Sequence, residues 1–543
     1  MLAHTARYLN QGLSPVTPAG HLALMTDLSR DPVFLKGRVT NGPAFAAAML
    51  VLGKIVKASA RQGAKDHSAY QEWVQGKYLE EIGDVRAQRL AQLPKLMERD
   101  AELRRLIKEI GKEIDEASEK LNERGAIQKY WNWLYDHNNA AWIIIDPIVS
   151  VQPDATFFEG FSIDESIYAR VKLPSECIET IDEIHPGTTN IDFGLGLDKE
   201  FSRVRTYRAL DLVVGSDAVT IETDIGSAVE KKIELPESWV RGLLEVQSAL
   251  AIASIKLDVS PGFVSEIVSR LGEEREKHGP RSLRFKLQPG APVAVEIEPW
   301  GDVLVDLESS YAGEVEREVR VWGRRRLLLM KDILPDASSV RIDLIDSGMP
   351  SFWTFNVDNI ELQVGLSGWT NLDWASRARF AAFMPVGNVA EHQLIRAAAL
   401  LKKHNTLSAE SLATELGLPT GGASATLRQL CAAGKAMFDS DLNAYRWREL
   451  YPEFDLDKLD NGGLEEREGL DLFREEAVMI EQEVQDNGAR KLMATVQDSG
   501  RESTEVELDE DGRVVYAECT CSHFRFHKLR EGPCRHMVAV ALQ

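Results

Sequence analysis

The spacing of apolar residues divides the chain into a helical first part and a mixed remainder. From Pro43 to about His137, apolar residues recur at the three- and four-residue steps that are typical of helices. The run from Ala44 to Ala60 is apolar almost all round, which predicts a buried helix. Residues 1–145 are therefore expected to form a helical region.

A heptad-like seam lies within this helical region. Its positions alternate in three- and four-residue steps with charged residues between them: Leu93, Leu96, Asp100, Leu103, Ile107, Ile110, Ile114, Ala117 and Leu121. Such a seam packs one helix against another. Two interpretations stay open, an intramolecular helical hairpin and a coiled-coil arm that docks a partner, because Pro94 and the Asp within the seam do not decide between them.

From Trp142 the pattern changes to short runs rich in Val, Ile and Phe between turn residues, which is typical of strands. The expected strands include 167–171, 210–214, 219–223, 283–287, 293–297, 303–307, 319–322, 351–357 and 360–366, and the expected helices are 238–253, 262–276 and 325–334. Residues 146–385 are thus predicted to be a mixed α+β block of one or two subdomains. Its basic stretches, 203–208 and 320–326, are expected to pair with carboxylates of the same block.

Residues 388–450 are predicted to form a compact unit of three helices and a hairpin. The helices are expected at 391–404, 409–416 and 423–433, with Ser408 as the N-cap of the second helix and Gly417 at its end. The hairpin strands are expected at 436–438 and 445–447. This order resembles a winged helix-turn-helix domain, and the resemblance implies that the third helix enters a DNA major groove.

Few basic side chains of this unit are placed for such a contact. Arg428 lies on the third helix, and Arg446 and Arg448 lie on the hairpin, so these three are the candidates for contact with a nucleic acid or a protein partner. Basic and acidic residues are nearly balanced in the unit, and a near-neutral unit binds duplex DNA weakly. Both a protein-docking and a DNA-reading role stay open.

A charged segment, Asp455 to Glu468, is expected to be a linker to the last region, residues 470–543. Four strand-like segments follow at 478–484, 491–496, 504–508 and 514–519. The turn residues 509–512 join the last two segments as a hairpin. The region therefore begins as a small antiparallel sheet.

The end of the chain carries the most specific chemistry. Cys519 and Cys521 form a C-x-C pair, and Cys534 and His536 form a C-x-H pair within the next fifteen residues. Three thiolates and one imidazole make a closed tetrahedral set for Zn²⁺. Side chains two apart on an extended segment point the same way, so the first pair can converge on one ion. The second pair fits a cysteine just before a helix and a histidine in its first turn.

This C-x-C…C-x-H pattern, with a hairpin before it and an apolar helix after it, resembles a SWIM zinc finger. The resemblance implies that Cys519, Cys521, Cys534 and His536 hold one structural zinc ion. By spacing alone, His523 or His527 could replace His536 as the fourth ligand, and the family pattern argues against both. Residues 519–543 contain four basic residues and one acidic residue. The four basic residues are expected to contact a partner: Arg525, Lys528, Arg530 and Arg535.

Composition and charge narrow the class of protein. A chain of 543 residues exceeds one core and implies a multidomain α+β protein. Its net charge of −22 disfavours a general nucleic-acid coat. The sequence shows no signal peptide and no apolar run long enough for a bilayer, and its isolated cysteines are typical of a reducing compartment. A cytoplasmic protein without a membrane partner is expected.

The familiar catalytic patterns are missing from the sequence: G-x-x-x-x-G-K-[ST], H-E-x-x-H, G-x-S-x-G and G-x-G-x-x-G after a strand. A closed three-thiolate zinc site also leaves no open position for substrate or water. We therefore expect no enzyme, although a carboxylate-based site assembled from distant segments stays an alternative.

A winged helix-like unit followed by a C-terminal SWIM finger, on a large N-terminal block, resembles the bacterial SWIM zinc finger proteins. For that family the resemblance implies zinc-dependent binding of protein or nucleic acid. Some members are encoded beside an AAA+ ATPase and a von Willebrand factor A protein, which implies an adaptor role in such a system. The leading expectation is a non-catalytic adaptor with a protein partner, and the alternative is a DNA-binding transcriptional regulator.

Overall fold

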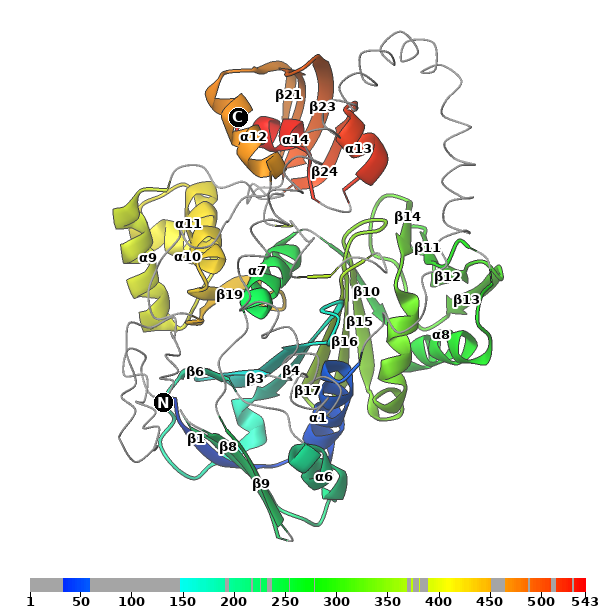
Figure 1. Ribbon diagram of the computed structural model, residues 1–543, viewed down its shortest axis with the longest axis vertical. Coiled ribbons are helices and arrows are strands. Elements are labelled where there is room, and N and C mark those ends of the chain that lie inside the picture. The colour runs from blue at the N-terminus through cyan, green and yellow to red at the C-terminus, as the bar shows by residue number, and fades with distance from the viewer. Residues whose placement is uncertain are drawn as a thin grey trace, which may run out of the picture.

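The computed structural model of the protein describes residues 33–58, 147–368, 389–450 and 464–543, apart from short gaps, together with 373–374 and 380. Within them the strands form five antiparallel sheets. The heptad-like seam at 93–121 and Arg530 lie outside the described residues. Figure 1 shows the large sheet in the middle, the helices of 389–450 to one side and the C-terminal elements at one end.

The largest sheet has the order β10-β15-β16-β17-β4-β3-β2-β6. Its strands are β2 (Ile148–Val151), β3 (Ala155–Phe161), β4 (Ile167–Pro174), β6 (Gly187–Asn190), β10 (Ile255–Val259), β15 (Ser339–Leu344), β16 (Ser351–Val357) and β17 (Ile360–Leu366). Strands β2 and β3 are buried along their whole length, and most positions of β4, β16 and β17 are buried too. Both faces of the sheet centre are therefore covered.

Two smaller sheets lie beside the large one. The first has the order β5-β1-β7-β8-β9 and contains β1 (Leu35–Val39), β5 (Ile178–Thr180), β7 (Leu210–Val214), β8 (Ala218–Thr223) and β9 (Gly226–Lys231). The second has the order β13-β12-β11-β14 and contains β11 (Leu283–Leu287), β12 (Val293–Ile297), β13 (Asp302–Asp306) and β14 (Arg317–Val321).

Helix α1 (Gly42–Val56) is the buried helix that the apolar run predicts. The Asn41 side chain caps its start by accepting a hydrogen bond from the Ala44 amide at 3.3 Å. Phe45, Leu52 and Ile55 are fully buried, and the helix packs against β4 and β17. The other helices of this block are α6 (Leu195–Arg203), α7 (Glu237–Ala251) and α8 (Pro261–Glu273), with 3₁₀ segments η2 (Ser175–Cys177), η3 (Arg324–Asp332) and η4 (Leu334–Asp336).

Residues 389–450 contain three helices and a small sheet of order β18-β20-β19. The elements are α9 (Glu391–His404), β18 (Thr406–Leu407), α10 (Ala409–Leu416), α11 (Thr420–Ala432), β19 (Ala436–Asp439) and β20 (Ala444–Trp447). Ser408 caps α10 through the Ser411 amide at 3.2 Å, and Gly417 ends the helix with a φ of 67°. The three expected helices and the hairpin are thus present, and β18 adds a short third strand.

The C-terminal elements form a four-stranded sheet with helices on one face. They are α12 (Leu464–Arg474), β21 (Val478–Asp486), β22 (Ala489–Gln497), β23 (Arg501–Leu508), β24 (Val514–Cys519), α13 (Ser522–His527) and α14 (Arg535–Ala541). Helix α14 packs on β22, β23 and β24, and α12 packs on α14 (Figure 1). The expected linker is therefore wrong in its last part, because α12 begins at Leu464.

Most long elements of the middle block lie where the apolar pattern places them, including β16 and β17 at the expected residues. The helix expected at 325–334 is instead the 3₁₀ segment η3 (Arg324–Asp332), followed by η4 (Leu334–Asp336). Internal pairing is confirmed in the second basic stretch, since Arg324 and Arg325 both pair with Glu276. No helix among the described residues is long and apolar enough to cross a membrane.

Candidate zinc centre and its surroundings

Three short elements bring the four expected ligands together. Cys519 is the last residue of β24, and Cys521 and Cys534 are the N-cap residues of α13 and α14. His536 lies in the first turn of α14, as the spacing predicts. The four ligand atoms lie within 4.8 Å of one another. His536 Nδ1 is 3.6 Å from the Cys519 sulfur and 3.9 Å from the Cys534 sulfur.

These distances fit a zinc ion. A tetrahedron with Zn–S bonds of about 2.3 Å and a Zn–N bond of about 2.0 Å separates its ligand atoms by about 3.5–3.8 Å. All four side chains are buried, so the ligand set is largely shielded from water. Hydrogen bonds within the cluster lower the pKa of the Cys521 thiol but raise the pKa of the Cys534 thiol, so a bound cation is needed to hold all three as thiolates. The residues present therefore fit one structural zinc.

The two histidines of the intervening segment lie apart from this cluster. The His523 and His527 rings stack on each other, with centroids 4.9 Å apart and an interplanar angle of 33°. Neither belongs to the ligand cluster found among the described residues. The structure therefore places His536, and neither His523 nor His527, in the ligand cluster.

A carboxylate outside the motif orients the histidine ligand. Asp498, in the turn between β22 and β23, lies with one oxygen 3.2 Å from His536 Nε2. A proton on Nε2 donates to this carboxylate and leaves Nδ1 as the metal-binding nitrogen. Asp498 also pairs with Arg535 at 2.8 Å, which fixes the carboxylate in turn.

Helix α12 holds the start of α14. The Arg535 amide donates to Glu465 at 2.9 Å, and the Arg535 guanidinium pairs with Glu468. The ligand motif does not reveal Asp498, Glu465 and Glu468 because they precede it by tens of residues. The three- and four-residue spacing of carboxylates and leucines around Glu468 is the signal that could have revealed the helix.

The expected basic contact surface is smaller in the structure than in the sequence. Arg535 is held by Glu468 and Asp498, whereas Arg525 and Lys528 are exposed. Between them Phe526 projects from α13 with 54% of its surface exposed. A cavity of about 290 Å³ opens beside this helix and is lined by Glu465, Ser522, His523, Phe526, His527 and Arg535 next to the ligands.

The two hairpin arginines were expected on a contact surface, and the structure buries both. Arg446 pairs with Asp154 at 2.7 Å and with Asp439 at 2.7 Å. Arg448 pairs with Glu159 at 2.6 Å, and both of these side chains are fully buried. The guanidiniums therefore satisfy carboxylates of the same chain, and in this arrangement neither reaches a phosphate.

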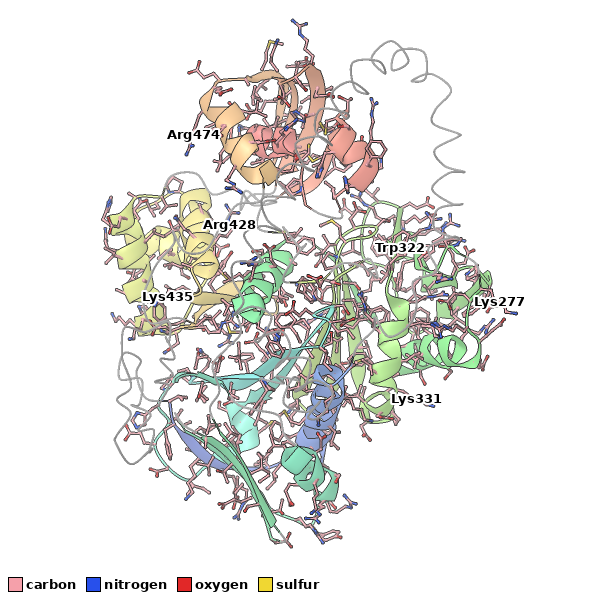
Figure 2. The ribbon with its side chains drawn as sticks, viewed as in Figure 1. Lys277, Trp322, Lys331, Arg428, Lys435 and Arg474 are labelled. Atoms are coloured by element: carbon pink, nitrogen blue, oxygen red, sulfur yellow. The ribbon has the colours of Figure 1, made fainter. Side chains whose placement is uncertain are left out.

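Helix α11, the expected groove-reading helix, is also covered. It packs against α7 as well as α9 and α10. Arg428, labelled in Figure 2, is buried on it, and exposed positions are confined to Gly421 and Gly422 at its start. The described structure therefore presents no long side chain of α11 to a DNA groove.

Comparison with known families identifies the zinc-binding segment. The model of the SWIM zinc finger matches residues 505–543, which contain all four ligands. The C-terminal segment is a SWIM zinc finger. SWIM fingers are binding modules for protein or nucleic acid, which accords with a closed metal site. No curated protein matches the chain.

Solved structures that match the chain share only a weak likeness with it, as three of them show. The proliferating cellular nuclear antigen of Entamoeba histolytica is 12% identical, with a TM-score of 0.31, over 41% of this chain and 88% of its own. A PCNA2–PCNA3 complex from Sulfolobus tokodaii is 12% identical, with a TM-score of 0.32, over 41% of this chain and 90% of its own. A. fulgidus PCNA bound to the C-terminal region of FEN-1 is 11% identical, with a TM-score of 0.32, over 41% of this chain and 88% of its own. These values assign no function to the chain.

Proposed function

We propose that the chain is a zinc-binding, non-catalytic adaptor of the cytoplasm, whose SWIM finger presents helix α13 to a protein partner. The observation that carries this proposal is the exposed Phe526 between the exposed cations Arg525 and Lys528. Aromatic and arginine side chains dominate the binding energy of protein interfaces. The zinc ion holds this helix in place through Cys521 at its N-cap.

The winged helix-like unit, residues 388–450, acts in this proposal as a fixed part of the scaffold. The cover of α7 over α11 and the buried pairing of Arg446 and Arg448 support that role over groove reading. The remaining domains are the helical region 1–145, the α+β block 146–385 and the finger region from 470 to the end. A closed zinc set without an open coordination position supports the non-catalytic reading.

Zinc content and partner binding test the proposal together. The purified chain is expected to carry about one zinc ion, and Cys534→Ser is expected to lose the ion and the fold of the finger, because metal binding supplies folding energy in such modules. Phe526→Ala is expected to keep the zinc and to weaken partner binding about tenfold or more. An AAA+ ATPase and a von Willebrand factor A protein are the first partners to test in the binding assay. A zinc-free native chain would refute the proposal.

The second candidate function is nucleic-acid binding by the same helix. An exposed aromatic ring between two cations suits stacking on an unpaired base. In this case Phe526→Ala weakens binding of a single-stranded oligonucleotide, and affinity falls steeply with salt. A gel-shift assay with single-stranded and duplex DNA at low salt separates this function from protein binding.

A further inference from the structure

The sheet of the finger region has one covered face and one open face. Leu492, Ala494 and Val506 point toward α14 and are buried. The alternate residues of the same strands point the other way. On that open face, Met479, Val484 and Met493 are exposed by 59%, 43% and 37%. Since sheets normally bury an apolar face against a second layer, these side chains mark a docking surface.

The open face has an apolar half and an acidic half. Strands β21 and β22 supply the apolar side chains, and β23 and β24 supply Glu505, Glu507 and Glu518, which share this face by register. Lys491 pairs with Glu505 and with Glu507, the latter at 2.7 Å. Three carboxylates thus face one ammonium. The surface that fits this face carries an apolar side chain with cations beside it.

The same chain carries an exposed apolar side chain beside cations on α9. Leu394, Ala397 and Leu401 form the buried side of this helix. On the opposite side Ile395 is 63% exposed, and Arg396 and Lys403 are exposed two helical turns apart along one side of it. Among the described residues, neither of these two cations forms an ion pair. The outer side of α9 therefore complements the open sheet face in charge, with Ile395 as its apolar contact.

We propose that the open sheet face of one chain docks α9 of a second copy. Ile395 lies on the apolar half, and Arg396 and Lys403 face the acidic half. Both surfaces are exposed within one copy, so the contact joins two copies. The two contacting surfaces differ, which makes the interface heterologous, so a third copy can add to the second in the same way. This contact is separate from the α13 surface proposed above.

The expected association is weak. The net charge of −22 repels copies at long range, and this repulsion is screened beyond about 8 Å at about 0.15 M salt. A single helix on a four-stranded sheet falls at the small end of protein interfaces, below about 1,200 Å². We therefore expect a dissociation constant on the order of 10–100 μM.

Sedimentation equilibrium of the zinc-loaded full chain tests the contact. The average mass is expected to rise with concentration past the dimer. Two variants each lose one surface: Glu507→Lys/Glu518→Lys reverses the sheet charge, and Arg396→Glu/Lys403→Glu reverses the helix charge. Each variant alone is expected to be monomeric. Their equimolar mixture is expected to associate again, because each then meets a complementary surface.

Two further variants keep the test decisive. Met493→Gln alters no charge and is expected to weaken association severalfold at unchanged zinc content, which covers the case of a misfolded charge variant. Arg474→Glu, on the exposed side of α12 (Figure 2), is the control and is expected to associate like the wild type. A wild-type chain that stays monomeric, charge variants that self-associate normally, or a mixture that stays monomeric would each overturn the proposal.

Discussion

At the residue scale, the zinc centre depends on one carboxylate that no ligand motif contains. His536 presents Nδ1 to the three sulfurs, so its Nε2 proton needs an acceptor in a buried place. Asp498 is that acceptor, and its own pairing with Arg535 keeps it from rotating away. Such outer partners raise the basicity of a histidine ligand and fix its ring.

Asp498→Ala is therefore expected to lower zinc affinity by about 10- to 100-fold, since His536 loses the group that fixes its tautomer. Asp498→Asn keeps a neutral acceptor and is expected to fall between this variant and the wild type. Competition against a chromophoric chelator measures the affinity. Asp471→Ala on α12, whose carboxylate pairs with an exposed arginine, is the control. Unchanged affinity in Asp498→Ala would show that the contact is incidental.

At the element scale, α12 belongs to the zinc finger's fold although the family match begins at residue 505. The helix lies against α14, and Gly469 sits at the closest approach. A Cβ on Gly469 would lie 2.7 Å from the Cβ of Val538 and 2.8 Å from the Arg535 carbonyl oxygen. Both distances are shorter than van der Waals contact, so only glycine lets the two helices pack this closely.

Gly469→Ala is expected to destabilise the finger by about 1–3 kcal/mol, because the added methyl group pushes α12 from α14. The chelator concentration that releases half of the zinc should fall along with the thermal midpoint of the finger. Gly500→Ala is the matched control, since a Cβ there meets nothing within 4 Å. Equal stability of the two variants would mean that α12 shifts without cost.

The sequence predicts those elements whose cause is local. The three cysteine ligands follow from their spacing, and α10 follows from its cap residues. The choice of His536 over His523 and His527 came from the resemblance to the SWIM finger, and the structure agrees with it. Helix α12 was missed because its glutamates are typical of a linker, and their partner Arg535 lies far along the chain. Strand β18 has two residues and forms only by pairing with β20. Tertiary contacts stabilise both elements, but only α12 has a local signal, the helical spacing around Glu468, whereas no local pattern reveals β18.

At the scale of the whole molecule, buried charge joins residues 389–450 to the large sheet. Arg446 and Arg448 reach Asp154 and Glu159, which lie 292 and 289 positions earlier. Burial alone raises the pKa of Asp439, but the nearby Arg170 and Arg446 guanidiniums lower it below its usual value, so the carboxylate stays ionised. Without these partners the hairpin arginines look like a contact surface, which explains the sequence prediction.

The pair of Arg448 and Glu159 provides the sharpest test of this joint. Both side chains are fully buried, and Tyr168 also donates to Glu159 at 2.5 Å. Arg448→Met leaves a buried carboxylate without its cation, so a loss of about 3–5 kcal/mol in the free energy of unfolding is expected. Adding Glu159→Gln removes the orphaned charge and should restore most of that loss, which urea denaturation measures as a coupling energy. Arg474→Met, at an exposed ion pair, is the control and should change little. Additive effects of the two buried substitutions would mean that residues 389–450 dock on the sheet through apolar contacts. The ion pair would then contribute nothing to the free energy of unfolding.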